Sequence, residues 1–206
     1  MNKLTSALFP SGKTNKHYLN YIKYSFISNT AISVQNSIAV QSMLSVITAE
    51  PELANINYIG KDIIGQLGSL IYMTKYTNKI DSKPKTFLNQ SHFIQQTSYF
   101  LLYYSSIIQP DYFIFVAGAS NILSNVSFIG YGAINAKCIE KVSDGKNIGQ
   151  IYTKLTCVNT LASTIGLGIG VYLNMYIEND FKMLLLPLCG VIRIIYFNKS
   201  ISGLIK

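Results

Sequence analysis

The sequence has little charge for its length. Of its 206 residues, 13% are Asp, Glu, Lys or Arg, about half of the roughly 25% that is usual in soluble proteins. A soluble fold of this size needs charged side chains over most of its surface, and long stretches here contain none. The composition disfavours an ordinary soluble enzyme and excludes a disordered chain or a coiled coil. A helical membrane protein remains.

Arginine, cysteine and catalytic motifs are also scarce. Arg193 is the single arginine beside sixteen lysines, and the net charge is +8. The lysines are spread over separate segments instead of forming an arginine-containing stripe, so we expect no nucleic-acid partner. Cys138, Cys157 and Cys189 are widely spaced and predict neither a metal site nor a disulfide framework. With no nucleophile–base pair, HExxH motif or carboxylate dyad, we expect no enzyme activity, no catalytic residue, no metal and no cofactor.

Long uncharged stretches dominate what is present. Four of them exceed the roughly 20 residues that a helix needs to cross a bilayer, and they cover residues 24–49, 86–110, 112–136 and 155–177. Two weaker candidates are residues 56–74, interrupted by Lys61 and Asp62, and residues 183–197, interrupted by Pro187, Gly190 and Arg193. The sequence therefore predicts an all-α, polytopic membrane bundle of about six transmembrane helices.

The charges between these stretches predict the topology. Basic residues gather in every second connecting segment, and Lys182 is the exception on the other side. The positive-inside rule then places both termini in the cytoplasm, although it does not say which membrane is crossed. We expect a leader at residues 1–23 with an LFPSG motif, one helical membrane domain at residues 24–199 and a short basic tail at residues 200–206.

Two segments allow other topologies. Residues 24–49 carry many Ser, Asn and Gln side chains, so this helix could lie at the membrane interface or stand inside the bundle with its polar face against other helices or water. The uncharged part of the second candidate, residues 63–74, is short enough for a re-entrant segment. Four spans with amphipathic N-terminal helices is the alternative architecture. A weaker alternative is a soluble helical protein that binds anionic membranes through its lysines.

Small residues recur at helical spacing. Ala162, Gly166 and Gly170 fall every fourth position on one helix face, and Gly65 and Gly68 do the same on the second candidate. Small side chains let the backbones of neighbouring helices approach closely in lipid. We expect helix packing at these positions, and we expect the protein to form homo- or hetero-oligomers with membrane proteins.

Polar residues inside the predicted spans are the candidate site. Lys61 and Asp62 would each cost about 2.5 to 3.5 kcal/mol at the centre of a membrane helix. They either lie at the headgroups or form a polar point inside the bundle, and as neighbours in a helix they are expected to face different partners. Asn121, Asn125 and Asn159 suit interhelical hydrogen bonds or, with Lys61 and Asp62, the lining of a substrate-binding path.

Two further features receive structural interpretations. Within the candidate span 183–197, Arg193 has ten residues before it and four after it, so we expect its side chain to extend to the cytoplasmic headgroups. Residues 7–14, ALFPSGKT, have the form of a phosphate-binding loop. No core strand precedes them, and the mechanism of such a loop requires one. We therefore reject nucleotide binding there.

Four motifs in order resemble one family. They are LFPSG at residues 8–12, KDIIGQLG at 61–68, GASNILSNVSFIGYGA at 118–133 and NIGQIYTKLTCVNTLASTIGLGIG at 147–170. Together they are similar to motifs of the root UVB sensitive family, although Gln150 stands where that family commonly has an acid. The resemblance implies an integral membrane protein. It also implies a link, in plants, to seedling development, UVB responses in roots, auxin transport and vitamin B6 homeostasis, without an agreed reaction.

Two functions follow as hypotheses. The first is a carrier, or carrier component, for a small polar solute of unknown identity, and it predicts that Asp62→Asn abolishes solute movement without preventing folding. The alternative is a non-catalytic membrane scaffold or assembly factor that acts through a protein partner. It predicts no flux, and loss of the partner when Gly166 and Gly170 are enlarged. Both hypotheses make the lipid bilayer the protein's environment.

Overall fold

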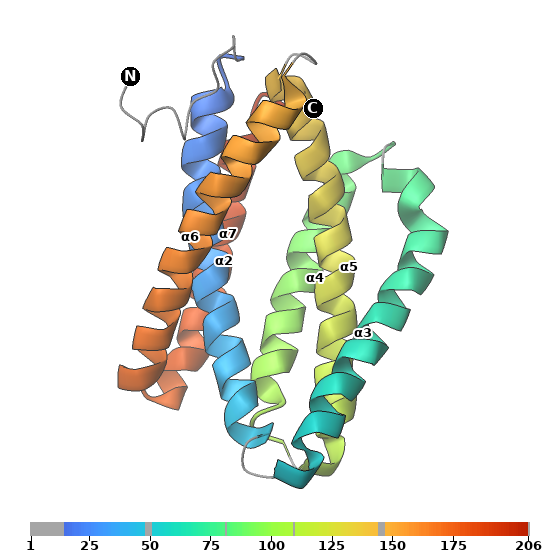
Figure 1. Cartoon of the computed structure of the whole chain (residues 1–206), viewed down its shortest axis with the longest axis vertical. Helices are drawn as coiled ribbons and strands as arrows, with labels where there is room; N and C mark the ends of the chain where they lie inside the picture. Colours follow the sequence, from blue (N-terminus) through green and yellow to red (C-terminus); the bar gives the residue numbers. More distant parts are fainter. Residues whose placement is uncertain (1–14, 48–50, 81, 109, 144–146, 206) are drawn as a thin grey trace.

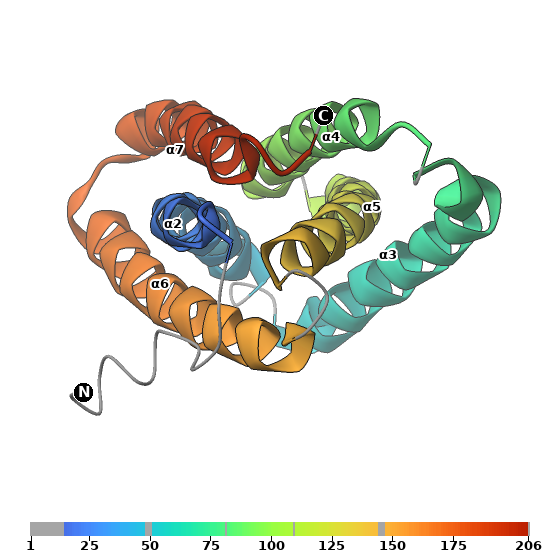
Figure 2. The same cartoon turned by 90° about the horizontal axis from the view of Figure 1, so that it is seen from above.

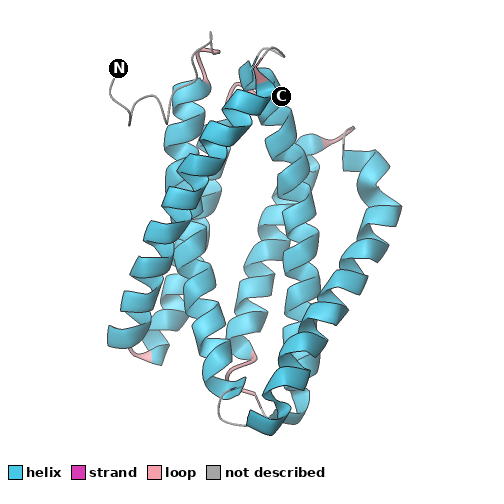
Figure 3. Cartoon of the chain, in the orientation of Figure 1, coloured by secondary structure: helices cyan, strands magenta, loops and turns pink. Residues whose placement is uncertain are grey.

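The structure, a computed structural model, describes residues 15–47, 51–80, 82–108, 110–143 and 147–205. These residues form six α-helices and no strand, joined by short connections (Figure 3). The helices are α2 (Tyr18–Ile47), α3 (Pro51–Ile80), α4 (Pro84–Tyr104), α5 (Pro110–Ser143), α6 (Ile148–Tyr176) and α7 (Asn179–Ile201). The all-α prediction is confirmed. The LFPSG motif lies outside the described residues.

Several helices extend beyond the uncharged stretches that predicted them. Helix α5 continues through Lys137 and Lys141, and α2 begins at Tyr18, inside the segment expected as a leader. Helix α3 runs without interruption through Lys61 and Asp62, so the re-entrant alternative for residues 63–74 is wrong. Charge does not end a helix. Helices end where the backbone N–H and C=O groups find other partners or where a proline intervenes, as at Pro84, which stands at the first turn of α4.

Two described helices have the length and mean hydropathy needed to cross a membrane. They are residues Tyr112–Ser143 of α5 and Ile148–Tyr176, the whole of α6. The prediction of six spans is therefore not confirmed. In α2, for example, serine, asparagine and glutamine residues lower the mean hydropathy although the helix is long enough.

The helices form two groups of three. Helix α2 packs between α6 and α7, and α5 packs between α3 and α4. Seen from above, α2 and α5 occupy the middle of the bundle, with α7 and α4 along one side and α6 and α3 along the other (Figure 2). The N-terminal end of α2 and the C-terminal end of α7 lie at the same end of the bundle (Figure 1).

The two groups are related by an inverted arrangement. Helices α2 and α6 run in the same direction, as do α5 and α3, whereas α7 is antiparallel to α2 and α4 is antiparallel to α5 (Figure 1). Half a turn of Figure 1 in its own plane brings α2, α6 and α7 to the places of α5, α3 and α4. Because α2–α4 and α5–α7 each contain an odd number of helices, the second triplet runs opposite to the first. Each group in space combines helices of both triplets. We call the two groups in space, α2 with α6 and α7 and α5 with α3 and α4, the two inverted repeats of the bundle.

A Ser-Asn pair on α2 connects its two neighbours. The Ser28 hydroxyl donates to the carbonyl oxygen of Arg193 on α7, over 3.3 Å. The Asn29 amide Nδ2 donates to Asn159 Oδ1 on α6, over 2.6 Å. Adjacent residues on a helix point about 100° apart, so one dipeptide reaches both flanking helices.

A second Ser-Asn pair does the same on α5. The Ser120 hydroxyl donates to the carbonyl oxygen of Ser98 on α4, over 2.8 Å. The Asn121 amide Nδ2 donates to the carbonyl oxygen of Lys61 on α3, over 3.1 Å. Each central helix therefore binds its antiparallel neighbour through a serine and its parallel neighbour through an asparagine, as the inverted repeat requires.

The interior of the bundle buries many polar side chains beside its hydrophobic clusters, and much of its surface is apolar. Helix α2 buries Ser25, Ser28, Ser33, Gln35 and Ser37, so it stands inside the bundle, which is one of the two positions that its sequence allowed. The outer faces of the flanking helices expose large apolar side chains, among them Ile59, Ile63, Leu67 and Ile71 on α3, Leu161, Ile165, Ile169 and Tyr172 on α6, and Leu184, Leu188, Val191 and Ile195 on α7.

The small residues lie where neighbouring helices come closest. A Cβ atom added at Gly166 would lie 2.5 Å from the carbonyl oxygen of Thr30, and one at Gly170 would lie 2.5 Å from the Cβ of Ser37. Ala162, on the same face of α6, is fully buried. On α3, added Cβ atoms would meet α5: at Gly65 the side chain of Asn121 at 2.6 Å, and at Gly68 that of Ile122 at 2.7 Å. These faces are therefore filled by helices of the same chain.

Candidate functional site: a polar cavity between the inverted repeats

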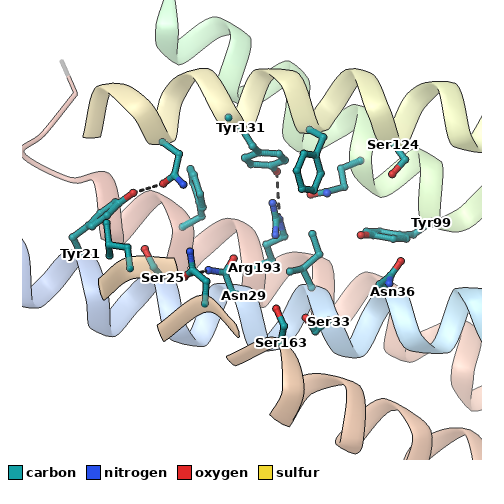
Figure 4. A pocket seen from close by; sticks show the side chains of 18 residues that line it. Tyr21, Ser25, Asn29, Ser33, Asn36, Tyr99, Ser124, Tyr131, Ser163 and Arg193 are labelled. Carbon is teal, nitrogen blue, oxygen red and sulfur yellow. Dashed lines mark hydrogen bonds between the residues drawn. The ribbon is translucent and has the colours of Figure 1, made fainter. Parts of the chain in front are cut away.

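A cavity of about 440 Å³ lies between the two repeats. Its lining comes from α2, α6 and α7 on one side and from α4 and α5 on the other, and most of the side chains are Ser, Asn, Gln, Tyr or Arg (Figure 4). The volume falls within the range of roughly 300–1,000 Å³ that is usual for sites of small molecules. The cavity is the candidate functional site.

Arg193 is the one charged side chain in the lining. It is 5% exposed, and its Nε donates to the Tyr131 hydroxyl over 3.4 Å. The guanidinium carbon lies 4.2 Å from the centre of the Tyr131 ring, and Figure 4 shows the two side chains facing each other across the cavity from α7 and α5. The expectation that Arg193 extends to the headgroups is wrong. Its position on α7 faces the inside of the bundle, where an aromatic face is available to a cation.

Two aromatic rings, those of His92 and Phe197, hold Tyr131 in place. The Tyr131 hydroxyl shares a short hydrogen bond with Nδ1 of His92. The rings of Tyr131, His92 and Phe197 meet edge to face, with centroid separations of 5.2 to 5.5 Å. This geometry is the favourable one for aromatic pairs. The phenol that Arg193 contacts is therefore fixed by α4 and α7 together.

The charge of Arg193 has no carboxylate beside it among the residues that the structure describes. The one ion pair in that part of the chain joins Lys61 Nζ to Asp62 Oδ1, over 2.6 Å. Removing an ion from water without a partner of opposite charge costs several kcal/mol, and cation–π contact returns about 2 kcal/mol or somewhat more when desolvated. The cavity is therefore electropositive.

Amide groups complete the cavity. Asn29 and Asn159 are joined across α2 and α6, and the hydroxyl of Tyr21 donates to Oδ1 of Asn135 on α5. Gln95 lines the cavity from α4 and is 2% exposed, and its Oε1 atom makes no hydrogen bond within the described chain. An unpaired buried acceptor costs about 1–3 kcal/mol, and a donor on a ligand that reached this oxygen would remove that cost.

The predicted site residues separate into two places. Asn159 lines the cavity, whereas Lys61, Asp62 and Asn121 meet between α3 and α5, outside it. There Asn121 Nδ2 donates to Asp62 Oδ1 over 2.8 Å. Lys61 Nζ also lies 4.2 Å from the centre of the Tyr58 ring. Lys61 and Asp62 therefore have different neighbours, as expected, and in addition form an ion pair with each other. Asn125 lies half-buried on α5.

Sequence reasoning missed Arg193, Tyr131 and Gln95 as site residues. The available signal was Arg193 itself, the sole arginine within a mostly apolar stretch, since an ionisable residue inside a membrane helix is a functional candidate by default. No group of three or more His, Cys, Asp or Glu side chains suited to a metal ion occurs among the described residues.

Comparisons with known proteins place the chain in a family. Residues 1–204 match the family model described as the vitamin B6 photo-protection and homoeostasis domain. Protein root UVB sensitive 4 of Arabidopsis thaliana is 23% identical over 88% of this chain and 36% of its own length. Protein root UVB sensitive 5 of the same plant is 26% identical over 80% of this chain and 35% of its own length.

The chain thus spans about a third of the length of the curated relatives it matches. No solved structure matches it. The match to the family model extends over almost the whole chain and includes every residue of the cavity. The protein with this polar cavity belongs to the root UVB sensitive family.

Proposed function

We propose that the chain is an integral membrane carrier, or the membrane-embedded part of one, for a small polar solute that binds in the central cavity. The observation that carries the proposal is the position of this cavity, between two inverted three-helix repeats. Many secondary transporters are built from inverted repeats and bind their substrate near the bilayer midplane, at the interface between the repeats. Rocking of one repeat against the other then opens the site to alternate sides.

The distribution of side chains supports membrane integration. Rows of Leu, Ile and Val are exposed on α3, α6 and α7, while Ser, Gln, His and Arg side chains are buried beside the hydrophobic clusters of the interior. Exposed apolar patches and buried polar groups are the two informative departures from the usual pattern of soluble proteins. Apolar patches of this extent mark surfaces that are covered by lipid or by another protein. In this proposal all six helices cross the bilayer. The bundle end at which α2 begins and α7 ends faces the cytoplasm (Figure 1).

Helix α7 has the features of a moving element. Pro187 stands inside it and leaves the Met183 carbonyl without its usual donor from four residues later. Nε2 of Gln35 on α2 donates to the neighbouring carbonyl oxygen of Leu186, over 2.9 Å. A proline inside a helix weakens or kinks it at that point, and Arg193 lies less than two turns beyond Pro187.

The family description supplies the first solutes to test. It names vitamin B6 homoeostasis, so the purified chain should be reconstituted into liposomes and uptake of radiolabelled pyridoxine and pyridoxine 5′-phosphate measured. We expect saturable uptake of at least one of them, reduced by Arg193→Gln. Lys199→Gln removes the same charge from an exposed position on the same helix and should leave uptake unchanged, which makes it the matched control.

Membrane integration is tested separately. After expression, membranes are washed with alkaline carbonate, which strips peripheral proteins, and then extracted with detergent. Release by carbonate would refute the carrier. Retention until detergent is added, combined with no uptake of either solute and a protein that co-purifies stoichiometrically, would favour the scaffold alternative.

A further inference from the structure

Among the described residues, the cavity lining contains a cation without an anion. Arg193 lines it as a buried side chain, and the other described lining residues include no Asp or Glu. Its guanidinium donates to Tyr131 through Nε. A guanidinium carries five N–H donors in a planar fork that matches the two oxygens of a carboxylate or phosphate. The four donors on its terminal nitrogens are therefore available for such a group.

A second buried group lining the cavity calls for a donor on the ligand. Gln95 Oε1 is buried and lacks a hydrogen bond within the described chain, and native proteins pair nearly all such groups. It comes from α4, in the opposite repeat from Arg193. A ligand that satisfies both residues carries an oxyanion for Arg193 and a hydroxyl or N–H group for Gln95.

The remaining walls suit an aromatic or other flat body. Tyr99, Phe128, Tyr131 and Phe197 line the cavity together with serine and asparagine side chains. Aromatic walls bind the flat faces of rings, and a few polar groups at fixed positions set the orientation of the ligand.

We infer that the cavity binds a small organic oxyanion, a phosphate monoester or a carboxylate, with the oxyanion on Arg193 and a hydroxyl or N–H donor on Gln95. The inference rests on the proposed function only for the claim that the bound molecule is also transported. It explains why a lone arginine is held inside a polar bundle, since the ligand supplies the missing negative charge.

The test measures binding separately from transport. Isothermal titration calorimetry on the purified chain in detergent would compare pyridoxine 5′-phosphate with pyridoxine, which differ by the phosphate and lack an aldehyde that could react with lysines. Benzoate tests the carboxylate source, and inorganic phosphate tests whether the free ion suffices. We expect the phosphate ester, or benzoate, to bind at least about tenfold more tightly than pyridoxine, as two charge-assisted hydrogen bonds allow.

Variants identify the residues responsible. Arg193→Gln should weaken oxyanion binding by about 10- to 100-fold, Arg193→Lys should retain part of it, and Lys199→Gln should retain all of it. Gln95→Leu should weaken ligands that carry a donor and leave benzoate unchanged. Because Arg193→Gln removes a buried charge without orphaning a carboxylate in the described chain, we expect it to elute from gel filtration as the unsubstituted protein does.

The outcomes are distinguishable. Oxyanion binding that depends on Arg193, without liposome uptake, would retain this inference and refute the carrier. Uptake of pyridoxine 5′-phosphate that is indifferent to Arg193→Gln would retain the carrier and overturn this inference. No binding of any of the three oxyanions at millimolar concentration, or equal binding by the protein and its Arg193→Gln variant, would also overturn it.

Discussion

Two glycines of α6 allow a test of whether close packing against α2 requires a small residue. Gly166 lies against α2 and Gly168 does not. An alanine at position 166 would place its Cβ 2.5 Å from the carbonyl oxygen of Thr30 and 2.6 Å from the Cβ of Ser33, both on α2, whereas an alanine at position 168 would have no atom within 4 Å. The positions are two residues apart in the same helix. Substitution by alanine therefore changes helix propensity equally and differs in packing.

The expected difference in stability is large enough to measure. Overpacking against a backbone carbonyl that cannot rotate away costs about 1 to 3 kcal/mol. At Gly168 the substitution gains about 0.5 to 1 kcal/mol, because alanine loses less backbone entropy than glycine in a helix. The gain in helix propensity is the same in both variants and cancels, so the free energies of unfolding of Gly166→Ala and Gly168→Ala should differ by the overpacking cost, about 1 to 3 kcal/mol. For a chain of this length the melting temperatures should differ by at least about 2 °C.

The assay is thermal unfolding in detergent followed by circular dichroism at the helical minimum. A double-mutant cycle at the next turn adds a check that does not depend on propensity. An alanine at position 170 meets the Cβ of Ser37 at 2.5 Å, so Ser37→Gly should recover part of the stability that Gly170→Ala loses. Equal melting of the Gly166 and Gly168 variants, together with no recovery in the cycle, would refute the α2–α6 packing and with it one wall of the cavity.

Three further substitutions test the two polar centres and the repeat. Tyr131→Phe keeps the ring under Arg193 but removes the hydroxyl that Arg193 and His92 share. We expect calorimetry to show a threefold or greater loss of oxyanion affinity, because one hydrogen bond contributes about 0.5–1.5 kcal/mol. Asp62→Asn leaves Lys61 without its carboxylate outside the cavity. The Asp62 side chain is 41% exposed, so solvent screening should limit the loss of unfolding free energy to about 1 kcal/mol, and solute uptake should persist, contrary to the expectation from sequence. Ser98→Ala removes a hydroxyl that donates to Ser120 across α4 and α5 and should cost about 0.6 kcal/mol in chemical denaturation, the average for such bonds in a membrane protein.

The inverted repeat gives Lys61, Asp62 and Asn121 a structural explanation. They occupy the contact between α3 and α5 that corresponds to the contact of Asn159 and Asn29 between α6 and α2. One of these equivalent contacts borders the cavity and the other is a cluster of paired polar groups outside it. The site predicted from sequence therefore combined residues from both repeats, because each repeat places polar residues at its central contact.

The sequence by itself determined the helical class, the approximate positions of the helices and the family. Long uncharged stretches can satisfy their backbone hydrogen bonds as helices whatever surrounds them, and ordered motifs identify relatives without any contact being known. It also indicated helix-packing positions such as Gly166 and Gly170, because close packing of two helices favours small residues at every fourth position of the sequence.

Only the tertiary structure decided which polar residues share a cavity. Arg193 and Tyr131 are 62 residues apart in the chain, and no periodicity within either helix shows that they face each other. The repeat is likewise not visible in the sequence, because its halves share few residues, such as Ser28–Asn29 and Ser120–Asn121. These pairs are equivalent because of the neighbouring helices to which their side chains form hydrogen bonds. Whether an arginine turns to the headgroups or into the bundle depends on what lies across from it, and that is a property of helix packing.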